Sequence, residues 1–145
     1  MASLVVEILT PEGPLWRGEA SALMARSTVG KFTVLAQHTA TVGDLVASVV
    51  RVEVPEGPVT FAVHSGFFEV ASGPEVGETR ATILASVAEL TSDIDVARAQ
   101  AAKERYEAEM AESRDDDGAR YALAAHGVAR AELRLAAATR RGALA

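Results

Sequence analysis

The chain contains no cysteine, and this absence excludes a disulfide framework, a thiolate metal site and a cysteine nucleophile. It also contains no run of about twenty apolar residues, so the sequence predicts no membrane-spanning helix and no membrane insertion. The first residues lack the basic stretch and apolar core of a secretory signal, and we expect no signal peptide.

Positive charge is scarce as well, because the net charge is −6 and the pI is about 5.1. Nucleic-acid binding needs a basic surface that meets the phosphates, so we expect no nucleic-acid partner. His38, His64 and His126 lie far apart and lack the spacing of metal ligands. Ser65 follows His64, but no nucleophile-elbow motif surrounds it. The sequence therefore predicts no metal site and no catalytic residue.

The charges in the last part of the chain are divided by sign. Residues 93–117 hold nine acids against four bases, a net charge of −5, whereas residues 118–145 hold five arginines against one glutamate, a net charge of +4. Helices of opposite charge favour folding back on each other, although each exposed ion pair contributes only about 0.2–0.5 kcal/mol. This division predicts an antiparallel pair of helices.

The first part of the chain consists of short apolar and β-branched runs separated by turn residues. Pro55-Glu56-Gly57-Pro58 is a strong hairpin signal, and Gly66 predicts a bulge or a bend. Short strands at roughly 8–12-residue spacing are typical of a β-sandwich or barrel. Phe61, Phe67 and Phe68 are expected in its core, with one of the adjacent pair open to exposure. Residues 15–19 lead into the second predicted strand. The predicted strands are 4–9, 22–25, 32–35, 45–54, 59–63, 66–70 and, as the last one, 81–85.

The chain becomes alanine-rich after residue 92, and alanine is the strongest intrinsic helix former. Ser92, with Asp95 three residues later, predicts a capping-box start for a helix over residues 93–113. An acidic loop over residues 115–118 and a second helix over residues 119–139 follow. The predicted fold class is α+β, an N-terminal β-sandwich in residues 1–88 followed by a C-terminal antiparallel α-helical hairpin in residues 89–145.

Two glycines affect the predicted end and stability of the second helix. Gly142 is expected to end it, and Gly127 lies in its middle, where glycine costs about 1 kcal/mol relative to alanine. Large apolar residues are few in both helices, and a buried alanine methyl contributes only about 0.8 kcal/mol. We therefore expect a hairpin with strong helix propensity and weak docking, which gives a physical route to a conformational switch.

Three stretches carry a resemblance to a known family. They are the opening residues 6–18, the segment Gly66-Phe67-Phe68-Glu69-Val70, and the segment Ile94-Asp95-Val96-Ala97-Arg98-Ala99. Together, in this order, they resemble the epsilon subunit of the bacterial F-type ATP synthase, and the last segment is similar to the Ile/Leu-Asp-x-x-Arg-Ala motif of its nucleotide-binding members. One departure is Thr33-Val34-Leu35-Ala36-Gln37-His38, where the family usually has Gly-Ile-Leu-Pro-Gly-His.

The resemblance implies a ten-stranded sandwich and a hairpin in a non-catalytic subunit of the rotor central stalk. Such a subunit would contact the gamma subunit, the c-subunit ring and the alpha and beta subunits of the catalytic hexamer, and would couple proton flow to ATP synthesis. It would lie peripherally at the cytoplasmic face of the plasma membrane. Its helices would inhibit ATP hydrolysis, with no cofactor required and ATP as a regulatory ligand. The alternative is a free-standing ATP-sensing, ligand-binding sandwich protein with a helical lid.

Arginines at helical spacing provide the candidate binding site. Asp95, Arg98 and Arg105 share one helix face, and Arg130 and Arg134 share a face of the second helix. A folded hairpin could bring these faces together into a cationic pocket for a triphosphate. The alternative interpretation is ordinary solvent-exposed faces with salt bridges. Glu89 and Asp95 could accept hydrogen bonds from adenine or ribose. The candidate binding residues are Glu89, Ile94, Asp95, Arg98, Ala99, Arg105, Arg130 and Arg134.

Overall fold

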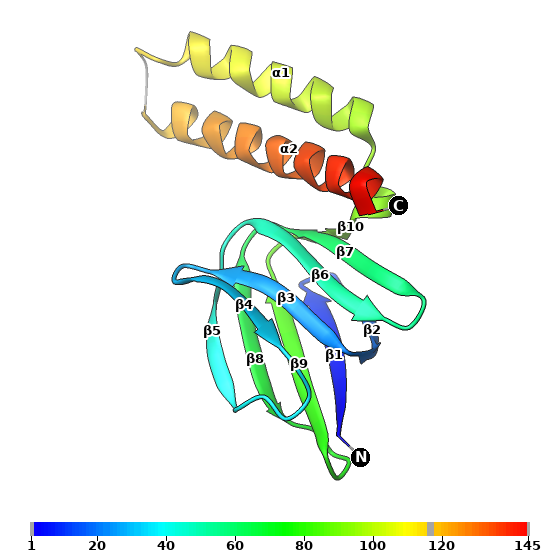
Figure 1. Ribbon diagram of the computed structural model, residues 1–145. Coiled ribbons are helices and arrows are strands. Elements are labelled where there is room, and N and C mark those ends of the chain that lie inside the picture. The colour runs from blue at the N-terminus through cyan, green and yellow to red at the C-terminus, as the bar shows by residue number, and fades with distance from the viewer. Residues whose placement is uncertain (1, 116–117, 145) are drawn as a thin grey trace. The chain divides into compact units, whose positions relative to one another are not determined.

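The computed structural model describes residues 2–115 and 118–144, with side chains up to residue 139. These residues form two compact units, the first ending at Leu90 and the second beginning at Thr91 (Figure 1). Four charged residues of the divided region lie outside the described side chains: Asp116, Asp117, Arg140 and Arg141.

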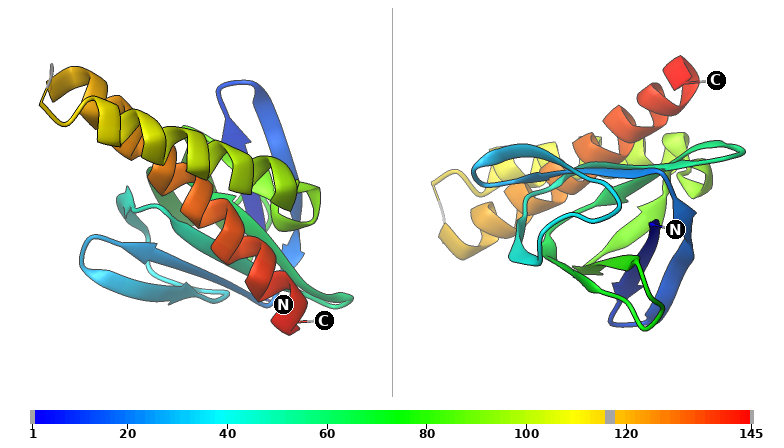
Figure 2. Two further views of the ribbon diagram at one scale, coloured as in Figure 1. Left: turned by 90° about the horizontal axis from the view of Figure 1, so that it is seen from above. Right: turned by 60° about the horizontal axis from the view of Figure 1, so that its bottom comes forward.

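The first unit is a sandwich of two five-stranded sheets (Figures 1 and 2). One sheet has the strand order β2-β1-β9-β8-β5 and the other β10-β7-β6-β3-β4. Neighbouring strands are antiparallel except β1 and β9, which pair in parallel. The predicted β-sandwich is confirmed. The strands are β1 (Ser3–Thr10), β2 (Gly13–Ala20), β3 (Ala22–Ser27), β4 (Gly30–Val34), β5 (Thr41–Leu45), β6 (Ser48–Val54), β7 (Gly57–Val63), β8 (Gly66–Ser72), β9 (Glu78–Ala85) and β10 (Ala88–Leu90).

The core lies between the two sheets, where alternate side chains of each strand meet. On β8 this alternation separates the two adjacent aromatic rings, because Phe68 is buried while Phe67 is 61% exposed. Phe61 is fully buried and meets Trp16 edge to face, with 5.9 Å between ring centroids. Phe32 stacks on Phe68 at 4.4 Å. Aromatic rings from both sheets thus close the sandwich.

Two strand predictions are wrong. The single run predicted over residues 45–54 is two strands, β5 and β6, which belong to different sheets. Its apolar residues are continuous because both strands bury side chains in the same core. The hydrophobic pattern therefore does not show where the chain passes from one sheet to the other. Residues 81–85 are not the last strand either, because the short β10 follows and pairs with β7.

The turns explain two of the sequence signals. Pro55 and Glu56 form the two-residue connection between β6 and β7, as predicted, and Gly57 follows with a positive φ of 117°. Gly66, however, marks no bulge, because its pairing with Ala85 continues the register of β8 and β9. A Cβ atom at Gly66 would lie 2.1 Å from the Leu84 carbonyl oxygen, so glycine there permits close approach of the two backbones.

The second unit begins with a 3-10 turn, η1 (Thr91–Asp93), and continues as α1 (Val96–Glu112) and α2 (Gly118–Leu144). Figures 1 and 2 show the two helices side by side and antiparallel, which confirms the predicted hairpin. The capping prediction for Ser92 is wrong because Ser92 lies inside η1, and α1 starts later. The predicted stop is also wrong, since α2 continues past Gly142. Within the described residues, neither helix combines the length and apolar character that crossing a bilayer requires.

The loop after β4 contains a strained residue at the site of the family departure. Among the described residues, Gln37 is the one non-glycine residue with a positive φ, at 68°. The His38 backbone N–H donates to the Leu35 carbonyl at 3.1 Å, and the Gln37 N–H donates to Thr79 Oγ1 at 2.7 Å. Leu35 to His38 therefore form a tight turn whose third residue is left-handed, the position that glycine fills most readily.

We predict that Gln37→Gly stabilises the sandwich. The left-handed conformation costs a residue with a side chain about 1–2 kcal/mol, and glycine avoids this cost. Glycine also loses more conformational entropy on folding, which reduces the gain by about 0.5–1 kcal/mol. The expected net gain is about 0.5–1 kcal/mol, or a few degrees in the thermal midpoint of the β signal. Gln37→Ala is the matched control and should give no such gain. A midpoint that falls in Gln37→Gly would contradict this account.

Candidate functional site

The start of α1 contains the acid and the arginine of the Asp-x-x-Arg pattern. Asp95 is the N-cap residue, with φ −82° and ψ 103°, and its Oδ1 accepts the backbone N–H of Arg98 at 3.0 Å. This bond satisfies one of the helix donors that lack an intrahelical partner. The pattern thus has a structural role in starting the helix, independent of any ligand.

The remaining candidates differ in exposure. Ile94 and Ala99 are buried, so their side chains belong to packing, whereas Arg98 and Arg105 are exposed. Arg130 and Arg134 on α2 are partly buried.

Glu89 lies on β10 of the sandwich unit. Its Oε1 is 3.8 Å from Nε2 of His64, whose side chain is almost fully buried. The structure thus gives Glu89 a partner on the sandwich, a pairing that the sequence did not indicate.

The structure brings Arg105 of α1 and Arg130 of α2 to one side chain, that of Tyr106. The Arg105 Cζ atom lies 4.7 Å from the centroid of the Tyr106 ring. A hydrogen bond from Arg105, together with its charge, lowers the pKa of the Tyr106 phenol; Arg130 acts in the same direction more weakly, and burial opposes both. The sequence analysis did not identify Tyr106 as part of this cluster. The one sequence feature that indicates it is its position directly after Arg105.

Gly127 provides the surface on which the Tyr106 ring lies. A Cβ atom at Gly127 would be 2.5 Å from ring carbons of Tyr106, far inside van der Waals contact. Gly127 is buried, as are Ala124 and Ala131 on the same face of α2. The glycine that seemed only to weaken the helix therefore allows an aromatic ring to pack directly on the α2 backbone.

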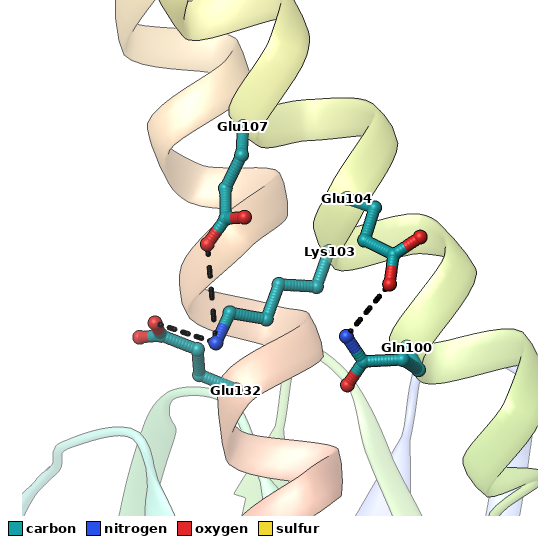
Figure 3. Close-up of polar contacts among 5 residues, drawn as sticks. All are labelled: Gln100, Lys103, Glu104, Glu107 and Glu132. Atoms are coloured by element: carbon teal, nitrogen blue, oxygen red, sulfur yellow. Dashed lines mark hydrogen bonds and ion pairs between the residues drawn. The ribbon is translucent and has the colours of Figure 1, made fainter.

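Ion pairs join the two helices along their exposed sides. The Lys103 ammonium group lies 3.7 Å from a Glu132 carboxylate oxygen on α2 and 3.8 Å from Glu107 on its own helix (Figure 3). Nearer the loop, Arg120 of α2 lies 3.4 Å from Glu112 of α1. Both interhelix pairs link opposite charges. The Arg120–Glu112 pair follows the charge division in the sequence, whereas in the Lys103–Glu132 pair the base lies on the acidic helix and the acid on the basic one. Because they are exposed, each contributes about 0.2–1 kcal/mol.

The chain matches known proteins over most of its length. The family model described as "ATP synthase, Delta/Epsilon chain, beta-sandwich domain" matches residues 3–91. The ATP synthase epsilon chain of Brevibacillus brevis is 37% identical over 113 residues, which cover 77% of this chain and 81% of the relative. That of Anoxybacillus flavithermus is 39% identical over 107 residues, covering 74% and 75%.

The fold also has a counterpart among solved structures. A chain of the Euglena gracilis mitochondrial ATP synthase structure, which contains OSCP, F1 and the c-ring, superposes with a TM-score of 0.75. The match covers 94% of this chain and 82% of that one at 22% identity. At this level of identity the likeness establishes the fold alone.

We predict that Gly127→Ala destabilises the hairpin although alanine is the better helix former. The propensity gain of about 1 kcal/mol is outweighed by overpacking against Tyr106, which costs about 1–3 kcal/mol. In a Tyr106→Ala background the sign should reverse, and Gly127→Ala should then stabilise α2 by about 1 kcal/mol. Amide hydrogen exchange of the helices measures both effects.

The matched control is Ala129→Gly on the exposed side of α2. It should cost about 1 kcal/mol in either background, because only backbone propensity changes. A stabilising Gly127→Ala in the presence of Tyr106 would show that the ring does not need the glycine surface.

Proposed function

The chain belongs to the ATP synthase delta/epsilon family, and on this premise we propose that it is a non-catalytic subunit of the rotor central stalk of a proton-translocating F-type ATP synthase. The observation that carries the proposal is the match to ATP synthase epsilon chains over about three quarters of the chain. As part of that complex the subunit lies peripherally at the cytoplasmic face of the plasma membrane and couples the membrane ring to the catalytic hexamer.

The sandwich is the part we assign to the gamma subunit and the c-subunit ring. Its two sheets enclose one continuous core, and a core packed in this way transmits strain with little deformation. Gln37 and His38 line a groove of about 460 Å³ together with the turn between β8 and β9, where Val76 is fully exposed. The groove combines polar loop groups with an apolar side chain, the mixed composition of a non-obligate interface, so we place the c-ring contact there.

The hairpin is the part we assign to regulation of the alpha and beta subunits. Its helices meet through small residues, and exposed ion pairs join them, so little free energy opposes their separation. A separated α2 carries excess positive charge and suits an acidic segment of a catalytic subunit. In this state the helices inhibit ATP hydrolysis.

Removal of residues 91–145 in the assembled enzyme should leave synthesis coupled and raise ATP hydrolysis several-fold. The fragment ends after β10, so the sandwich keeps all ten strands. Hydrolysis rates across a range of ATP concentrations, compared with enzyme containing the full chain, measure the effect. Equal rates at every ATP concentration would remove the inhibitory role while leaving the stalk role intact.

We also propose that ATP binds the closed hairpin as a regulatory ligand. The chain is acidic, so a polyanion binds only where cationic side chains converge, and Arg105 and Arg130 converge from the two helices. A ligand that contacts both helices shifts the equilibrium toward the closed form. ATP then favours the state that does not inhibit.

Calorimetry on the full chain should detect ATP binding that Arg98→Ala and Arg130→Ala weaken. Each lost hydrogen bond to a charged group costs about 1.5–3 kcal/mol, which corresponds to roughly a tenfold to hundredfold rise in Kd. Arg120→Ala is the matched control, because Arg120 pairs with Glu112 away from the phenol and should leave the Kd unchanged. No heat at millimolar ATP would contradict ATP binding. Equal binding by all variants would show that ATP binds elsewhere on the chain.

A further inference from the structure

A single ammonium group joins carboxylates of both helices. Lys103 Nζ lies 3.7 Å from Oε1 of Glu132 on α2 and 3.8 Å from Oε1 of Glu107 on α1 (Figure 3). An ammonium group carries three donors that rotate, so it can serve two acceptors from different helices. The two carboxylates therefore lie close to each other, and the charge of Lys103 offsets their repulsion in the closed hairpin.

Glu132 is the exception to the basic charge of α2. Residues 118–145 hold five arginines and one acid, and that acid is Glu132. In the closed hairpin Glu132 lies beside a base of α1, although α1 is the acidic helix. In the pair between Arg120 and Glu112, by contrast, the base lies on α2 and the acid on α1. When the helices separate, Glu132 is therefore the one negatively charged side chain in the sequence of α2.

We propose that Glu132 limits inhibition by acting on both states of the hairpin. The inference rests on the proposed function, in which a separated α2 contacts an acidic segment of a catalytic subunit. In the closed state Glu132 is attracted to Lys103, and in the separated state it is repelled by the acidic segment. Both effects favour the closed hairpin, so the acid on the basic helix restrains the inhibitory state.

The two effects are modest and have the same sign. The side chains of Lys103 and Glu132 are partly exposed, and a pair of this kind changes an equilibrium by about 1.5-fold to fivefold. Repulsion between like charges on exposed faces changes it by a further factor of about 1.5 to 2. Glu132 should therefore shift the balance between the closed and the inhibitory state by about twofold to tenfold in total.

Glu132→Gln in the isolated full chain measures the first effect alone, because no acidic partner is present. Separated helices exchange their amide hydrogens faster than packed helices do, so the exchange rates of α1 and α2 should rise about 1.5-fold to fivefold. Lys103→Gln breaks the same interhelix pair from the other side and should raise the rates as well. Unchanged exchange in both variants would overturn the attraction in the closed state and the proposal with it.

The same two variants in the assembled enzyme measure both effects together. ATP hydrolysis by enzyme that lacks residues 91–145 gives the rate without inhibition, and comparison with it gives the ratio of inhibited to active enzyme. Lys103→Gln should raise this ratio by the factor found in the isolated chain, because the charge of α2 is unchanged. Glu132→Gln should raise it by a further factor of about 1.5 to 2, because the repulsion is lost as well.

Glu112→Gln is the matched control. It removes the same chemical group from the interhelix pair with Arg120 and leaves the charge of α2 unchanged. Its factor in the assembled enzyme should therefore equal its factor in the isolated chain.

The outcomes separate the inference from the function beneath it. Equal factors for Glu132→Gln in the isolated chain and in the enzyme would overturn the repulsion and therefore the proposal, while the inhibitory role would stand. If removal of residues 91–145 leaves hydrolysis unchanged, the inhibitory role and the proposal are both overturned. Faster amide exchange in the isolated variants would then still show that Lys103 joins the two helices.

Discussion

The helical hairpin depends on small residues between its helices. Ala99 on α1 and Ala124, Gly127 and Ala131 on α2 are buried, and small side chains let two helices approach closely but bury little apolar area. Tyr106, which packs on Gly127, adds a large side chain to this interface. Small side chains, this aromatic contact and exposed ion pairs therefore hold the two helices together.

The sandwich meets the opposite requirement. Its core draws side chains from both sheets, and the parallel pairing of β1 with β9 joins the first strand to the ninth. Such a unit unfolds as a whole, because no strand can leave without exposing the core. The two units of this chain therefore pack differently, one through a continuous core and the other through small side chains.

Several residues of the candidate site have structural roles. Asp95 caps α1, Ile94 and Ala99 are buried, and Glu89 lies beside His64 on the sandwich. A motif read along the chain therefore includes residues that start and pack a helix.

The sequence by itself determined the α+β class, the hairpin at Pro55-Glu56, the charge division of the helices and the family resemblance, because these depend on local propensity, turn chemistry and composition. Only the tertiary structure decided that residues 45–54 divide between two sheets, that Gly66 admits a neighbouring backbone and that Gly127 supports Tyr106. These features depend on which residues face each other across two elements. One-dimensional patterns do not contain that pairing, because the same alternation or the same glycine fits several partners.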